Sequence, residues 1–317
     1  MRVHSSGQPL VWLSALLIAL AVGGCGGDDG TGPSDTTAPG ISAGPTVSTV
    51  TETTAQVAWT TDEPATSQVS FGLTTTYGSA EQSATLTTEH SVLLSTLSPY
   101  TLYHFQVAST DADGNVAQSN DGQFTTDRSL GIYLSEGWQH LAGGNAVSAR
   151  TSFQGALGKS ATSAEAHLGV AWCDFVERNF EEAAAGFENA LTYLTSQQLS
   201  LDAQVGLALA EAQQGDLAQA AVYAQSVLAQ DAEYTFAYLP WVDYLDLHVV
   251  IARASYADAD YTAAQEEVDY LNPHNVLDPG MSGYTVALGA AINVLYQTYC
   301  TEGGSDGGKT GETTAEW

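Results

Sequence analysis

The sequence predicts two consecutive domains, an all-β sandwich followed by an all-α helical solenoid. Residues 41–126 contain short alternating runs rich in Thr, Val and aromatic residues, separated by turn residues, which is typical of half-buried strands. Residues 128–300 carry helical periodicity instead and repeat one pattern after 34 residues. A short polar junction at 126–129 separates the two patterns, so we expect two units that each have their own core.

Residues 1–24 have the features of a signal peptide. Arg2 supplies a positive charge, and the apolar run over 10–22 is shorter than a comfortable membrane span. Small residues then lead directly into Cys25, and this arrangement resembles a bacterial lipobox. The resemblance implies a palmitate-bearing membrane lipoprotein that is cleaved before Cys25 and lipidated on it. Gly26, where Asp would signal retention, favours the outer over the inner membrane.

Residues 25–40 are rich in Gly, Asp, Thr, Ser and Pro and hold almost nothing that a core could bury. Such a composition predicts a flexible tether between the lipid and the first domain. The last stretch, 301–317, combines Gly, Thr and acidic residues, and we expect a disordered acidic tail there.

Two motifs characterise the β-domain. Trp59 ends an alternating run, and residues 97–103 read Leu-Ser-Pro-Tyr-Thr-Leu-Tyr. Together they resemble the bacterial fibronectin type III family, which has an immunoglobulin-like fold. The resemblance implies a core position for Trp59 and a tyrosine corner at Tyr103. The acidic run 111–115 is interpreted as a hairpin turn rather than a calcium loop, because no Glu follows at the spacing of a bidentate ligand.

The solenoid is predicted from its repeats. A small, aromatic, small pattern at Ala149, Phe153 and Ala156 recurs 34 residues later around Phe187. A third copy spans 203–228 at a shift of 37, and a weaker fourth spans 249–271. This pattern resembles the tetratricopeptide repeat (TPR) family, in which paired helices stack. The resemblance implies that Phe153 and Phe187 fill the gaps between neighbouring helices.

In TPR arrays the first helix of each pair lines a concave groove. The resemblance therefore implies an aromatic and apolar partner groove, for which the candidate residues are Trp138, Leu141, Trp172, Phe175, Leu209, Ala212, Arg253 and Tyr256. The alternative is that these side chains pack between adjacent repeats.

A final predicted helix, 284–300, is apolar around most of its circumference. One interpretation is an end cap that also meets a partner, and the other is a helix folded back into the groove as an internal ligand. Only the second would bring Cys300 to Cys173 for a candidate disulfide, and two unbridged thiols are the alternative.

The remaining composition excludes several functions. Seven Lys and Arg against 36 Asp and Glu cannot neutralise nucleic-acid phosphates. The chain has no Gly-rich phosphate loop, nucleophile elbow or paired-Cys zinc spacing. We therefore expect no enzyme, no catalytic residues, no metal site and no cofactor.

The resulting prediction is a non-catalytic, membrane-anchored scaffold of the cell envelope that binds an envelope protein or peptide through the TPR-like groove. The alternative is a surface glycan-binding lipoprotein, similar to helical-repeat lipoproteins of the starch-utilisation type. Tyr238, Trp241 and Tyr244 would then supply the aromatic platform. Exposed coplanar aromatic rings would favour the glycan, and a continuous apolar trough would favour the peptide.

Overall fold

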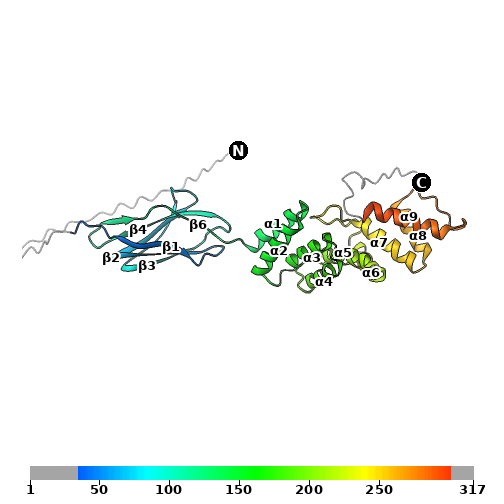
Figure 1. Cartoon of the computed structure of the whole chain (residues 1–317), viewed down its shortest axis with the longest axis horizontal. Helices are drawn as coiled ribbons and strands as arrows, with labels where there is room; N and C mark the ends of the chain where they lie inside the picture. Colours follow the sequence, from blue (N-terminus) through cyan, green and yellow to red (C-terminus); the bar gives the residue numbers. More distant parts are fainter. Residues whose placement is uncertain (1–34, 301–317) are drawn as a thin grey trace, which may run out of the picture.

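The computed structural model describes residues 35–300 and shows an elongated molecule with the β-domain at one end and the helices at the other (Figure 1). The predicted fold class, a β-domain followed by a TPR-like helical solenoid, is confirmed. The signal peptide, the lipid site at Cys25 and the acidic tail lie outside the described residues.

Six strands form the β-domain within the described part of the chain: β1 (Ile41–Ser48), β2 (Ala55–Gly72), β3 (Ser79–Leu94), β4 (Leu102–Thr110), β5 (Val116–Gln118) and β6 (Gly122–Thr125). The first part of β2 pairs with β1 and the end of β3, and its second part pairs with β4 and the start of β3. The register breaks between Thr60 and Ala65. Because β2 and β3 continue through this break, they join the two layers that face one shared core.

The core of the β-domain follows from strand alternation. Ala55, Val57 and Trp59 point inward from β2, while the residues between them are half exposed. Trp59 is 3% exposed, and its indole donates to Ser109 Oγ at 2.9 Å. Tyr103 is also buried, and its hydroxyl accepts a hydrogen bond from the Ser98 backbone N–H at 3.0 Å.

The end of the predicted tether contacts this domain. Pro39 is buried, and Gly40 exchanges two hydrogen bonds with Asp62, one through the Asp62 carboxylate and one through its backbone N–H. The carbonyl of Asp35 accepts from the Asn115 side chain at 3.0 Å. The tether prediction over 25–40 is therefore corrected at its end, because Pro39 and Gly40 pack against the β-domain while residues 35–38 are exposed.

Helices fill the rest of the described chain: α1 (Leu130–Ala142), α2 (Ala146–Lys159), α3 (Ala164–Val176), α4 (Phe180–Thr192), α5 (Gln197–Gln214), α6 (Leu217–Leu228), α7 (Tyr244–Ala257), α8 (Tyr261–Leu271) and α9 (Tyr284–Tyr299). Most begin at a Ser, Asn or Asp whose side chain accepts from the first turn. The first eight form four consecutive pairs, in agreement with the repeats.

The repeat signature has a direct packing role. Phe153 is fully buried, and its ring occupies the space where a Cβ at Gly137 or Gly169 would stand. Phe187 fills the corresponding space beside Gly206. Each Phe thus lies against the glycine of the following pair, so the glycines permit the close approach that propagates the solenoid.

Helix α9 is an end cap. Leu288, Ile292 and Leu295 are buried against Val249 of α7 and Val268 of α8. The fold-back interpretation is therefore wrong. At the end of the array α9 buries its apolar inner face against α7 and α8. A different segment of the chain, residues 229–243, covers the predicted groove.

Candidate functional site

The face shared by α1, α3 and α5, which the resemblance predicts as concave and which we call the concave face, is covered by the chain itself. Residues 229–243, which connect α6 to α7, return across α1, α3 and α5, and we call this stretch the plug segment. Phe236 is 1% exposed and stacks on Trp172, with ring centroids 4.9 Å apart. Phe236 also makes an edge-to-face contact with Trp138, with ring centroids 5.7 Å apart. Phe236 thus occupies the position in which an external peptide side chain was expected.

Hydrogen bonds fix the shape of the plug segment. The backbone N–H of Phe236 donates to the Val242 carbonyl, and that of Tyr244 donates to the Tyr234 carbonyl. The Tyr234 hydroxyl donates to Asp202 Oδ1 at 2.7 Å, and both side chains are buried. Burial raises the pKa of Asp202, while the hydrogen bonds from Tyr234 and Gln198 oppose that rise. The plug segment is therefore anchored to α5 at a buried polar pair.

The plug segment and the adjacent repeats bury most of the predicted groove residues. Within the described chain, five of the predicted groove residues are buried: Trp138, Leu141, Trp172, Phe175 and Leu209. Ala212 is buried as well. The prediction of an open groove is corrected for these positions, because the plug segment and adjacent repeats cover them. Trp138 still borders an open hollow at one end of this face. Trp172 Nε1 has no acceptor in the described part of the chain.

Arg253 and Tyr256, the last predicted groove residues, lie beside α9. The Arg253 guanidinium is 4.3 Å from the ring centroid of Tyr296, and the Tyr256 hydroxyl donates to the Thr285 carbonyl at 3.0 Å. Both side chains are half-buried and line an open hollow of about 500 Å³ between α7 and α9. They therefore hold the end cap in place and do not continue the filled groove.

One end of the concave face stays open. A hollow of about 480 Å³, which we call the α1 hollow, is lined by Gly131, Leu134, Ser135, Trp138, Gln139, Ala142, Glu165, Ala237 and Tyr238. Tyr238 is 37% exposed and lies flat on Trp138, with centroids 4.1 Å apart and planes 4° apart. Glu165 Oε1 accepts from Trp138 Nε1 at 2.9 Å and from the Tyr238 hydroxyl at 3.4 Å. Burial, then the Glu165 charge, raises the pKa of Tyr238.

The α1 hollow joins residues far apart in sequence. Trp138 was a predicted site residue, and Tyr238 belonged to the alternative glycan platform, whereas Glu165 was missed. The alternation of Tyr234, Phe236 and Tyr238 before Pro240 is a signal for an extended aromatic segment, and it could have indicated the plug segment.

The two described cysteines are not bridged. Cys173 is fully buried in the core of the second repeat, while Cys300 is half-buried at the end of α9 and lies 3.9 Å from the Asp246 carbonyl. The candidate disulfide is therefore corrected, since the end-cap position of α9 does not bring Cys300 to Cys173.

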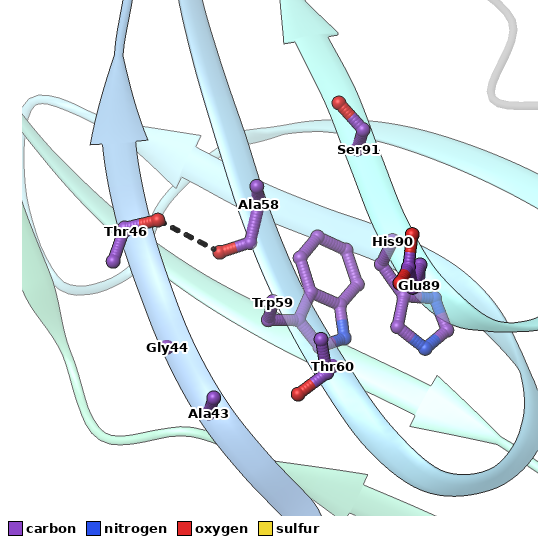
Figure 2. Close-up of a pocket in the computed structure, with 9 residues that line it drawn as sticks. All are labelled: Ala43, Gly44, Thr46, Ala58, Trp59, Thr60, Glu89, His90 and Ser91. Atoms are coloured by element: carbon purple, nitrogen blue, oxygen red, sulfur yellow. Dashed lines mark hydrogen bonds between the residues drawn. The ribbon is translucent and has the colours of Figure 1, made fainter.

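The β-domain has a shallow hollow of its own. Figure 2 shows Trp59 and His90 side by side on β2 and β3, with Gly44 on the neighbouring β1. The rings stack at 4.7 Å, and His90 contacts the hydroxyls of Thr61 and Ser67 through its two nitrogens. Burial lowers the pKa of His90. Both ring nitrogens of His90 are thus hydrogen-bonded within the domain, and the Trp59–His90 pair is part of the core.

Three carboxylates meet at the edge of the same domain. Oxygen atoms of Asp35, Glu63 and Asp111 all lie within 4.8 Å of one another. Asp111 accepts from the backbone of Asp113 and from Asn115, and these bonds close the predicted turn. Partial burial and then the nearby Asp111 charge raise the pKa of Glu63. The Asp111 carboxylate stabilises this turn, and its oxygens are occupied by donors of the turn itself.

Among the described residues, no helix is both long and apolar enough to span a membrane. Attachment to a membrane through Cys25 thus concerns residues beyond those described.

Comparison with known proteins agrees with the two-domain description. Residues 37–125 match the Fibronectin type III domain family. A solved fibronectin type III domain of human fibronectin type III domain containing protein 3 is similar over 32% of this chain and 96% of that one, at 20% identity and a TM-score of 0.26. No curated protein matches the sequence.

About half of the chain is similar to further solved structures, and one of these is named as a tetratricopeptide repeat protein. A tetratricopeptide repeat protein from Parabacteroides merdae matches 53% of this chain at 13% identity and a TM-score of 0.37, and the match spans 60% of that protein. PilF of Pseudomonas aeruginosa matches 53% of this chain and 84% of its own, at 17% identity and a TM-score of 0.30. The chain therefore contains a fibronectin type III domain followed by helices with TPR-like neighbours.

Proposed function

We propose that this protein is a non-catalytic scaffold of the cell envelope, anchored by lipid at Cys25, that binds a protein partner through its helical domain. One observation carries the proposal. The concave face holds an extended aromatic segment of its own chain and leaves the α1 hollow open beside it. A partner polypeptide would bind in the α1 hollow, next to the exposed ring of Tyr238.

The α1 hollow has the chemistry of a binding site. Apolar walls from Leu134 and Ala142 surround a few polar groups, of which Glu165 is held by two hydrogen bonds. Binding sites generally combine such walls with a small number of placed polar groups. The pairing of a β-domain with a helical repeat also supports an interaction role, since repeat surfaces generally bind other chains.

Site-specific photocrosslinking in cells tests the proposal. A photoreactive residue at Gln139, on the exposed rim of the α1 hollow, should yield a discrete protein adduct. The matched control is Val147 on α2, which is 72% exposed and lies outside the hollow. Absence of an adduct at 139, or equal adducts at both positions, would contradict a partner at this surface.

The anchor needs a separate test. Changing Cys25 to Ser should move the protein from the membrane fraction to the soluble fraction, because one lipid-bearing cysteine is the proposed attachment. Mass spectrometry of the wild-type N-terminal peptide should find acyl chains, and density separation should place the protein in the outer membrane. A wild-type chain that is membrane-bound but carries no lipid would overturn the anchor.

A glycan ligand is the second candidate, because Tyr238 and Trp241 expose 37% and 38% of their surfaces. Aromatic faces of this kind stack on sugar rings. Screening the full chain in detergent against envelope and plant polysaccharides would test it. Binding that disappears with Tyr238→Ala would favour the glycan, whereas absence of binding leaves the protein partner.

A further inference from the structure

The α1 hollow contains a carboxylate that no described part of the chain neutralises. Within residues 35–300, no Lys, Arg or His forms an ion pair with Glu165. Its two hydrogen-bond donors, the Trp138 indole and the Tyr238 hydroxyl, are both neutral. Both donate to the same oxygen, Oε1, so the acceptor capacity of the carboxylate is not exhausted.

Aromatic rings stand next to this carboxylate. Tyr238 and Trp138 stack in parallel, and the exposed Tyr238 contributes to the lining of the hollow. A cation over an aromatic ring is attracted by the ring quadrupole, and the attraction grows when the cation is desolvated. A carboxylate and an aromatic wall together therefore select a positive charge carried on an apolar stem.

We propose that the α1 hollow binds a lysine or arginine side chain of the partner protein. This inference rests on the proposed scaffold function and identifies the chemistry of its ligand. The aliphatic part of such a side chain would lie along Leu134 and Ala142, and its charged group would reach Glu165. Gln139 and Ser135, both exposed on the rim, would contact the neighbouring backbone of the partner.

Charge complementarity supports a basic partner over other occupants. The chain carries a net charge of −29, so its overall field attracts a basic protein and repels an acidic one. Three of the chain's few cations, Arg128, Arg150 and Lys159, already pair with carboxylates elsewhere. The chain therefore offers little of its own to neutralise Glu165.

A binding titration separates a cation site from a merely apolar one. The full chain in detergent is titrated with N-acetyl-arginine amide, N-acetyl-lysine amide or N-acetyl-norleucine amide, and the indole N–H resonance of Trp138 is followed by NMR. The two cationic probes should shift this resonance, and the neutral norleucine probe should not. Equal shifts from norleucine would overturn the inference.

Glu165→Gln tests the carboxylate while it keeps an acceptor for both hydrogen bonds. We expect it to lower the affinity for the cationic probes by about tenfold, because the charge-assisted hydrogen bond between the probe and the carboxylate is lost. Glu188→Gln on α4, an exposed Glu outside the hollow, is the matched control and should have no effect. Tyr238→Ala removes the exposed ring of the hollow and should also lower the affinity for the cationic probes. Tyr238→Phe keeps a ring and should retain their binding. Unchanged affinity in Glu165→Gln would overturn the inference.

The crosslinking experiment then separates this inference from the scaffold function. Loss of the adduct at 139 when Glu165→Gln is added supports both. An adduct that persists at full yield overturns the cation inference and leaves the scaffold intact. Absence of any wild-type adduct, together with binding of the cationic probes, overturns the scaffold and assigns the hollow to a free cationic small molecule.

Discussion

Arg128 lies over the ring of Tyr100, with the guanidinium carbon 4.1 Å from the ring centroid, and also donates to the Tyr100 hydroxyl at 2.8 Å. Tyr100 belongs to the β-domain, and Arg128 immediately precedes the helical domain. Arg128 also pairs with Glu136 of α1 at 3.2 Å. Nearby, Lys159 of α2 reaches Glu52 and Asp127. Two cations thus fasten two domains whose hydrophobic cores are separate.

We therefore predict that Arg128→Ala loosens the domain arrangement without unfolding either domain. A cation over an exposed ring contributes little to the stability of a fold, but enough to bias the orientation of two domains. Small-angle X-ray scattering should show a broader distribution of interdomain distances, further broadened by Lys159→Ala. Arg178→Ala, at an exposed arginine away from these contacts, is the control and should leave the scattering unchanged.

The plug segment should be a structural part of the helical domain. Phe236→Ala removes a ring that contacts Trp138 and Trp172, and we expect a loss of about 3–5 kcal/mol in the free energy of unfolding, as for other buried Phe residues. Denaturant unfolding followed by the helical circular dichroism signal measures this loss. Val222→Ala on α6, at a side chain that is 56% exposed, should cost far less. Equal stabilities of the two variants would mean that the plug segment only rests on the surface.

The buried Asp202 predicts a pH dependence. Burial raises the folded-state pKa of this carboxyl above its usual value near 3.8, so the folded state holds the proton more firmly than the unfolded state does. Its contribution is fully present below the unfolded pKa and is lost as the pH rises through the raised folded pKa. Asp202→Asn keeps an acceptor for Tyr234 and should gain stability relative to wild type over that window. Urea unfolding of both proteins between about pH 4 and pH 7 gives the difference. A difference that does not change with pH would contradict the raised pKa.

The sequence predicted the fold class of both parts because both patterns are local. Strand alternation around Trp59 and the spacing from Phe153 to Phe187 each depend on neighbours that the chain keeps close. The filled groove depends on Phe236 meeting Trp172, and no short-range period encodes that contact. One signal was available. The connection over 229–243 is much longer than the links between the helices from α1 to α6, and it alternates aromatic residues like a strand.

The position of α9 was left open by the sequence for a related reason. Its apolar circumference fitted both an end cap and an internal ligand, and only the packing of Leu288 and Ile292 against α7 and α8 distinguishes them. Part of the outer surface remains apolar, since Val286 is 74% exposed. A hydrophobic pattern thus indicates how much surface a helix buries, but not which neighbour covers it.

The thiols provide a direct check of the end-cap position. Burial raises the pKa of Cys173 to about 12, so almost none of this thiol is ionised near neutral pH, and alkylating reagents react with the thiolate. Cys300 is half-buried, at the end of α9. Iodoacetamide should therefore label Cys300 in the native protein and spare Cys173, and both should label once denaturant opens the core. Peptide mapping without reducing agent locates each label. A linked peptide containing both cysteines would contradict the end cap, because it would require α9 to lie against the second repeat.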